Sequence, residues 1–457
     1  MLQIQNGPPS LNCRGGSRRS AIKAGFLGLL GLTTADWLRL QAAGAARRDK
    51  KSVILLWLDG GPSHMETYDP KPDAPSEYRG PWGALETNVS GIRISKQLPL
   101  HAKLADKMVF LRSMHHKNGD HFAAAHWMLT GRLGSTSTSL PQKYPSVGSI
   151  VARTRGANAP GVPAYVGLPA AQSVYLFPGY QGAAYLGPAY QPFDVNTAQK
   201  YLSAADASPI QAPQCLENFS GDPRRTGERV DLLAQLDHFR RDLDRSGTMS
   251  AMDRYQEKAV DMILGNAARE AFDMNRESAR TRDRYGRGPW GHYTLMARRL
   301  VEAGVGFVTV DMPHWDDHSG IEKGHGYKLP VLDAAVSALV QDLADRSLLQ
   351  DVLVIVMGEF GRTPKLNQGQ PGIAIPGRDH WGDAMSVLLA GGGLRTGQVV
   401  GATNARGEYP IERPLTPADL LATVYHFLGI DPHQSFNDHT GRPVPLLDSG
   451  EAIAEII

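Results

Sequence analysis

The stretch DVLVIVMGEFGRTP, residues 351–364, decides the expected fold. Its first half contains VLVIVM, a short continuous apolar run that is typical of a strand in a parallel sheet covered on both faces. Its second half places Glu359 and Arg362 directly after that strand. Ligands of open α/β sheets bind just beyond the carboxyl ends of such strands, so both charged side chains are candidate site residues. The alternative interpretation is a turn whose charges face water.

Other apolar runs lie beside polar residues in the same way. SVILLWLDGG, residues 52–61, is a predicted strand that runs into Asp59. VGFVTVD, residues 305–311, is followed by HWDDHS, which contains Asp316 and His318. GRDHW, residues 377–381, places His380 before the apolar run MSVLLAG.

Segments with helical periodicity alternate with these strands. They cover residues 288–304, 329–345 and 415–429, and the last has Thr416 as its predicted N-cap. Residues 227–286 are charged, nearly free of proline and spaced like amphipathic helices, so we interpret them as a helical insertion. The alternation predicts an α/β fold, a three-layer α/β/α sandwich with a mainly parallel central sheet.

Composition excludes some function classes. Of the 457 residues, 42% are hydrophobic and 21% are charged, which is ordinary for a soluble globular protein. The net charge of +2 and the absence of a basic patch interleaved with aromatic residues argue against a nucleic-acid partner. No apolar run approaches the roughly 20 residues that a membrane span requires.

The amino-terminal sequence has the pattern of an export signal. SRRSAIKAGFLGLLGL pairs Arg18 and Arg19 with an apolar run, and the small residues of QAAGAA follow at a position where a peptidase could cut. We therefore expect residues 1–46 to be a twin-arginine signal peptide and residues 47–457 to form one domain in the periplasm or outside the cell. Cys13 lies in the predicted signal, so Cys215 alone remains and no internal disulfide or thiolate cluster is expected.

The polar residues at the strand ends predict a metal site. Several carboxylates that meet at one edge of a sheet repel each other at neutral pH, and a bound cation relieves that repulsion. Carboxylate mixed with imidazole favours Zn²⁺ or Mn²⁺, with Ca²⁺ as a further option because it prefers oxygen ligands. Each residue taken singly also fits a turn or a hydrogen-bonded loop. The candidate metal ligands are Asp59, Asp316, His318, Glu359 and His380.

These motifs also carry a resemblance to a known family. The order of ILLWLDGG, HFAAAHWMLTGR, WDDH, VIVMGEFGR, GRDHW and VLLAGGGLRTGQVVGAT resembles the alkaline phosphatase and sulfatase superfamily. Within it, the sequence is most similar to the branch of exported bacterial proteins described as domain-of-unknown-function 1501. The resemblance covers nearly the whole chain after the predicted signal. It implies an alkaline phosphatase-like fold and metal ligands at Asp59, Asp316, His318 and His380.

Two positions depart from the superfamily pattern. Phe360 stands where the superfamily has a metal-binding histidine, and His121 stands where it has a nucleophilic Thr, Ser or modified Cys. Three interpretations of His121 remain open: a metal ligand that compensates for Phe360, a nucleophile or general base, or a sign that catalysis has been lost. Arg362 has a planar guanidinium suited to a sulfate or phosphate, although a salt bridge to a neighbouring acid is an equal alternative.

The sequence therefore predicts an exported metal-dependent hydrolase of phosphate or sulfate esters. Its substrate would be a small-molecule or polysaccharide ester, with His121 and Arg362 as catalytic residues. The alternative hypothesis is a non-catalytic protein that binds an anionic ligand or polysaccharide on the same fold. The altered positions at Phe360 and His121 motivate that alternative.

Overall fold

The chain divides into two units, Met1–Lys50 and Lys51–Ile457, and the second holds the fold. In a computed structural model, the described residues are 50–134, 142–171, 181–196, 202–206, 210 and 266–457. The predicted signal peptide, residues 1–46, lies outside them. So does most of the predicted helical insertion, whose described end contains two α-helices and a 3₁₀ helix. Both assignments remain predictions.

An eight-stranded sheet forms the centre of the second unit, with the strand order β12-β4-β11-β8-β1-β7-β5-β6. β1 runs parallel to both of its neighbours, β7 and β8. The pairs β5–β7, β5–β6 and β4–β12 are also parallel. The mainly parallel sheet predicted from the sequence is therefore confirmed. Its strands are β1 (Ser52–Trp57), β4 (Met108–Met114), β5 (Tyr165–Leu168), β6 (Phe193–Asp194), β7 (Phe307–Asp311), β8 (Val352–Met357), β11 (Met385–Gly391) and β12 (Gln398–Val400).

β11 runs antiparallel to both of its neighbours, β8 and β4, and the sequence pattern did not predict this. The described chain between β8 and β11 contains a short hairpin, β9 (Gly361–Arg362) and β10 (His380–Trp381), and no helix. For the next strand to run parallel, the chain must first cross back to the opposite end of the sheet, usually through a helix. Without such a crossover, the chain re-enters the sheet at the end where β8 finishes, so β11 runs in the opposite direction to β8. Further two-stranded pairs are β2 (Ala84–Glu86) with β3 (Arg93–Ser95), β13 (Ala402–Thr403) with β14 (Pro410–Glu412), and β15 (Ser435–Asn437) with β16 (Pro443–Pro445).

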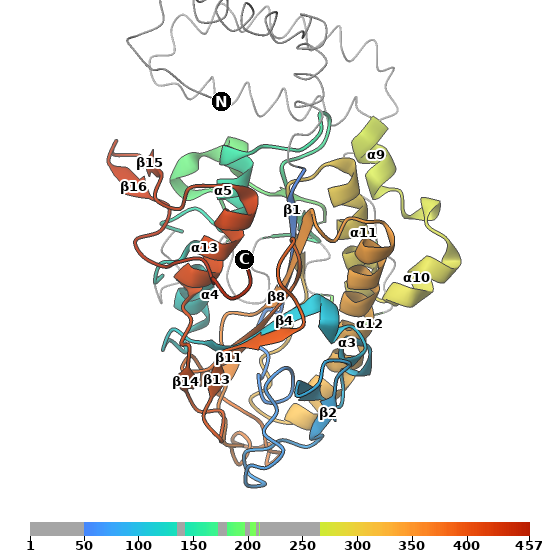
Figure 1. Cartoon of the computed structure of the whole chain (residues 1–457), viewed down its shortest axis with the longest axis vertical. Coiled ribbons are helices and arrows are strands. Elements are labelled where there is room, and N and C mark those ends of the chain that lie inside the picture. The colour runs from blue at the N-terminus through green and yellow to red at the C-terminus, as the bar shows by residue number, and fades with distance from the viewer. Residues whose placement is uncertain (1–49, 135–141, 172–180, 197–201, 207–209, 211–265) are drawn as a thin grey trace, which may run out of the picture. The chain divides into compact units, whose positions relative to one another are not determined.

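Helices cover both faces of the sheet, which confirms the three-layer arrangement (Figure 1). Successive side chains of each strand point to opposite faces of the sheet, so they belong to two separate hydrophobic cores. In β1, Ile54 and Leu56 belong to the core that includes residues of α11 and α12, whereas Val53 and Leu55 belong to the core that includes residues of α4, α5 and α13. The helices are α3 (Pro99–Ala102), α4 (His121–Thr130), α5 (Val147–Thr154), α9 (Asn266–Phe272), α10 (Ala279–Tyr285), α11 (Pro289–Ala303), α12 (Ile321–Asp345) and α13 (Pro417–Leu428), with short 3₁₀ helices η1 (Ala105–Lys107), η2 (Ala184–Leu186), η3 (Pro188–Tyr190) and η5 (Met274–Arg276).

α12 begins eight residues before the predicted start at residue 329, because it starts at Ile321 and continues through Pro330. Proline inside a helix removes a backbone hydrogen bond and usually ends the helix. Here His325 and Lys328, both buried, hold the first turns against Asp317, so tertiary contacts outweigh the local preference. None of the described helices combines the length and the hydropathy that a membrane span requires.

Thr416 caps α13 as predicted. Its hydroxyl accepts a hydrogen bond from the Asp419 backbone N–H, and the Asp419 carboxylate accepts one from the Thr416 backbone, which makes a capping box. Thr416→Ala is therefore expected to lower the free energy of unfolding by about 1 kcal/mol. Urea unfolding followed by circular dichroism measures this change. Thr416→Ser keeps the hydroxyl and should match the wild type; an alanine variant as stable as the serine variant would contradict the assigned cap.

Candidate metal centre

Three of the predicted site residues follow three neighbouring strands of the sheet and lie at the carboxyl ends of those strands. β7, β1 and β8 lie side by side and run parallel, with Trp57 in register with both Asp311 and Met357. Their carboxyl ends therefore meet at the same edge, followed by Asp59, Asp316 and Glu359 respectively from β1, β7 and β8.

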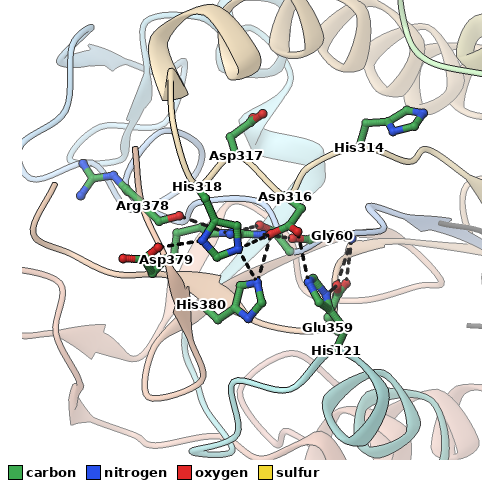
Figure 2. A network of polar contacts seen from close by, with 12 residues as sticks. Gly60, His121, His314, Asp316, Asp317, His318, Glu359, Arg378, Asp379 and His380 are labelled. Atoms are coloured by element: carbon green, nitrogen blue, oxygen red, sulfur yellow. Dashed lines mark hydrogen bonds and ion pairs between the residues drawn. The ribbon is translucent and has the colours of Figure 1, made fainter. Parts of the chain in front are cut away.

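The Asp316 carboxylate is the centre of this arrangement (Figure 2). Its Oδ1 lies 2.9 Å from His318 Nε2 and 3.0 Å from His380 Nε2. Its Oδ2 lies 3.4 Å from His121 Nε2. Three elements that are distant in sequence thus converge on one carboxylate: the loop after β7, the β9–β10 hairpin and the start of α4.

All three histidines present the same ring nitrogen to Asp316. The Nδ1 atom of His318 is 2.7 Å from Asp379 Oδ1, that of His380 is 2.7 Å from the Gly119 carbonyl, and that of His121 is 2.6 Å from Glu359 Oε1. Each Nδ1–H therefore has an oxygen acceptor, so Nε2 is the ring nitrogen that faces the centre and would coordinate a cation there. Metal-ligating histidines show this arrangement, because the acceptor on one nitrogen fixes the tautomer and the ring orientation.

The pKa shifts of His121, Asp316 and His318 show that these side chains interact strongly. Burial would lower the pKa of His121, but hydrogen bonds to Asp316 and Glu359 and their charges raise it to about 10. Burial would raise the pKa of the Asp316 carboxyl, but its hydrogen bonds to the three histidines and the charge of Arg362 lower it well below its usual value. The Asp316 hydrogen bond is the main cause that raises the pKa of His318. In the metal-free protein, a protonated His121 thus accompanies an ionised Asp316.

His121 and Glu359 form the side of the centre next to β1. Glu359 is 1% exposed, and its two carboxylate oxygens accept hydrogen bonds from the Gly60 backbone N–H at 3.0 and 3.2 Å. Gly60 has φ +109°, and a Cβ there would lie 2.7 Å from the Asp316 backbone nitrogen. Only glycine permits both the backbone conformation and the close approach of the two loops.

Arg362 does not take the substrate-binding position that the sequence suggested. Its side chain is fully buried, and its guanidinium donates to the carbonyls of Gly60, Gly61 and Arg378 and to Asp316 Oδ1, the last at 2.6 Å. The guanidinium N–H groups that would bind an ester anion therefore already donate to protein oxygens. The salt bridge to a neighbouring acid, the alternative interpretation, is the arrangement observed. The Arg362 guanidinium thus contacts the Asp316 carboxylate from within the protein.

Asp59 lies at the same edge but outside the histidine group. It is 6% exposed, and its backbone carbonyl accepts a hydrogen bond from the Trp315 N–H at 3.0 Å. Among the described residues, the side chains grouped closely enough to hold a metal ion are His121, Asp316 and His380, whose ligand atoms all lie within 4.8 Å of one another. His318 contacts two members of this group, and Glu359 contacts the third.

Asp311 is a site residue that the sequence analysis missed, because it reads as the last residue of β7. It is 2% exposed, and neither carboxylate oxygen has a hydrogen-bond partner among the described residues. Burial, followed by the charges of Asp59 and Glu359, raises the pKa of Asp311 well above its usual value. A buried acid that faces two more acids without a donor either keeps its proton or is ionised beside a cation that offsets the charge. The donors present therefore fit a divalent cation.

The loop that carries Asp316 and His318 is fixed from behind by α12. Asp317 Oδ2 accepts hydrogen bonds from His325 Nδ1 and Lys328 Nζ, each at 2.7 Å. Both partners are at most 1% exposed. Asp317 thus turns away from the centre while its two neighbours turn toward it (Figure 2). This support pre-positions the candidate ligands.

Phe360 occupies the position where the superfamily resemblance implied a histidine. It is fully buried, and its ring centroid lies 4.8 Å from that of His121 and 4.6 Å from that of His380. A phenyl ring cannot coordinate a metal, but here it packs against two candidate ligands. His116 is a supporting residue as well, since its Nε2 lies 2.6 Å from the Glu359 carbonyl.

The fold and the site together define an α/β protein with an acidic and imidazole-rich centre at the carboxyl ends of its parallel strands. Residues 50–457 match the family described as "Protein of unknown function (DUF1501)", and the chain belongs to that family. The family resemblance inferred from the sequence is confirmed. No curated protein matches the chain.

Solved structures offer more distant similarities. The PsFucS1 sulfatase from Pseudoalteromonas sp. is 14% identical, with 86% of this chain and 70% of that chain covered and a TM-score of 0.38. The phosphonate monoester hydrolase SpPMH from Silicibacter pomeroyi is 11% identical, with 88% and 76% covered and a TM-score of 0.34. The lipoteichoic acid synthase LtaP from Listeria monocytogenes is 10% identical, with 87% and 74% covered and a TM-score of 0.34. The fold assignment rests on the sheet topology of the chain itself.

Proposed function

We propose that this protein is an exported, metal-dependent hydrolase of phosphate or sulfate esters. The observation that carries the proposal is the shared orientation of His121, His318 and His380, each with Nε2 toward Asp316 and Nδ1 on an oxygen acceptor. The resemblance to the alkaline phosphatase and sulfatase superfamily supports ester hydrolysis as the reaction. Export rests on the amino-terminal sequence pattern alone.

His121, Asp316 and His380 would hold the cation, with His318, Glu359 and Asp59 close to it. The mixture of carboxylate and imidazole favours Zn²⁺ or Mn²⁺. When bound, a divalent cation supplies a Lewis acid that polarises the ester oxygen and offsets negative charge in the transition state. The residues around it have separate tasks. Asp379 and Glu359 fix the histidine rings, and Arg362 holds the Asp316 carboxylate in place.

His121 serves best as a ligand in this arrangement. Its Nδ1 is committed to Glu359, and its Nε2 lies within the group of potential ligand atoms. This leaves the ester to be attacked by water instead of by a side-chain hydroxyl.

The alternative function is binding of an anionic ligand without turnover. Phe360 in place of a coordinating histidine and His121 in place of a hydroxyl nucleophile favour it. Both functions use the same centre, so turnover discriminates between them.

Removal of the metal tests the proposal. The purified protein, loaded with Zn²⁺ or Mn²⁺, is expected to hydrolyse p-nitrophenyl phosphate, bis-p-nitrophenyl phosphate or p-nitrophenyl sulfate. Dialysis against a chelator should remove both the metal, measured by elemental analysis, and the turnover, and adding the metal back should restore both. Turnover that survives in the metal-free protein would refute the metal-dependent reaction. Stable metal binding with no turnover of any of the three esters would favour the binding function.

A further inference from the structure

A cleft of about 480 Å³ lies next to the candidate metal centre. The two are linked by Asp379, which lines the cleft and also contacts His318 Nδ1 at 2.7 Å (Figure 2). Segments from three parts of the chain form its walls: the region of Tyr78, the β9–β10 hairpin and the turn before β14. A ligand with a group at the metal centre can therefore extend into this cleft.

Aromatic rings from each of the three segments line the cleft: Tyr78, Trp381 and Tyr409. The Tyr409 side chain is 53% exposed, so its ring is accessible to a ligand in the cleft. Trp381 is fixed, because its Nε1–H donates to the Glu408 carbonyl at 2.7 Å. The cleft thus presents aromatic surface in a partly rigid frame.

Polar groups stand among these rings. The Asp379 side chain is 52% exposed, and Glu408 is held by a 2.7 Å hydrogen bond from Asn404 Nδ2 to its Oε2. Each carboxylate oxygen can accept more than one hydrogen bond, so both residues can still accept from a ligand hydroxyl. Lys365 lines the cleft and is exposed. The Arg406 guanidinium lies 5.1 Å from the centroid of the Tyr78 ring.

We propose that this cleft binds a sugar ring of an anionic saccharide, so that the ester next to that ring lies at the metal centre. A pyranose ring offers apolar C–H faces that pack on aromatic side chains, and hydroxyl groups around its edge that donate to carboxylates. Aromatic surface combined with two carboxylates matches that ligand. A hydrophobic ligand would leave Asp379 and Glu408 without donors, and an anionic chain without hydroxyls would form no hydrogen bonds with these two carboxylates. Lys365 and Arg406 supply the positive charge for a second sulfate or phosphate group on the saccharide.

This inference rests on the proposed function for the position of the ester, but its test does not depend on turnover. Binding of dextran sulfate, a sulfated sugar polymer, is compared by calorimetry with binding of poly(vinyl sulfate), which has the sulfates without sugar rings. Tyr409→Ala should weaken dextran sulfate binding about tenfold, the equivalent of one lost ring contact. The same variant should leave poly(vinyl sulfate) binding unchanged. Tyr409→Phe keeps the ring and should retain wild-type binding.

Leu133→Ala is the matched control, because Leu133 is an equally exposed apolar side chain, at 54%, outside the cleft. It should change the affinity for neither polymer. Failure of the wild type to bind dextran sulfate would overturn the inference. So would an equal loss for both polymers in Tyr409→Ala, which would mean that charge alone is recognised, or an unchanged affinity for dextran sulfate. A protein that binds dextran sulfate as expected but hydrolyses no ester would refute the proposed hydrolase and leave the saccharide cleft standing.

Discussion

His380→Ala is expected to lower the affinity for Zn²⁺ or Mn²⁺ by more than about 100-fold and to abolish ester hydrolysis. Loss of a residue that merely orients a metal-ligating histidine costs 10–100-fold, so loss of a ligand itself should cost more. His380 contributes an Nε2 atom to the only group of closely spaced candidate ligands in the described part of the chain. Elemental analysis after gel filtration, together with a metal titration, measures the effect.

The substitution should leave the protein folded, because His380 is not part of either hydrophobic core. Its side chain is 23% exposed and lies on the short β9–β10 hairpin, outside both hydrophobic cores. His433→Ala is the control, since His433 is an exposed histidine outside the site. It should leave metal content and turnover unchanged. A His380→Ala protein that retains wild-type metal content and turnover would rule out the centre as assigned.

The position of the site could be predicted because its physical cause is local in sequence. An apolar run such as VLVIVM predicts a strand that is covered on both faces. The residues that follow it lie at the carboxyl ends of the parallel strands. Asp316, His318 and Glu359 were predicted by that rule, and the structure brings them together with His380, which precedes the strand MSVLLAG. Asp311 satisfies the same rule, as an acid at the end of an apolar run. Because Asp311 is the last residue of β7, it is easily taken for part of the strand.

Features set by chain path or side-chain direction could not be predicted. The reversed direction of β11 depends on how the segment after β8 returns to the sheet, and strand composition does not encode that path. For Arg362 the sequence left a substrate contact and a salt bridge as equal alternatives; the side chain turns inward onto Asp316 and the backbone carbonyls of the Gly60–Gly61 turn. The early start of α12 depends on contacts of His325 and Lys328 with Asp317, on a separate loop.

The hairpin that carries His380 depends on a buried ion pair. Arg378 Nε donates to Glu66 Oε2 at 2.9 Å, and Arg378 Nη2 donates to Glu66 Oε1 at 2.7 Å. Both side chains are at most 2% exposed, and Arg378 also donates to the carbonyls of Thr363 and Tyr78. The pair thus ties the segment after β1 to the two residues, Asp379 and His380, that follow Arg378 in the centre.

Glu66→Gln is therefore expected to lower the free energy of unfolding by about 3–5 kcal/mol, because it leaves the Arg378 charge buried without its partner. Metal affinity should fall as well, since the hairpin loses its anchor. Urea unfolding at pH 7 measures the first effect. The control is Glu455→Gln, which breaks the exposed 2.6 Å pair with Arg413 and should cost less than about 1 kcal/mol. Equal stability losses in the two variants would contradict the anchoring role.

The same pair predicts a pH dependence. Burial would raise the pKa of Glu66, but the charge and hydrogen bonds of Arg378 lower it below the ordinary value of 4.5. Stabilisation by a carboxyl with a lowered pKa is fully present above the unfolded-state value and is lost as the pH falls through the folded-state value. The stability difference between the wild type and Glu66→Gln should therefore be largest near neutral pH and shrink below about pH 4.5. A difference that stays constant from pH 7 to pH 3.5 would mean that Glu66 acts through its shape and not through its charge.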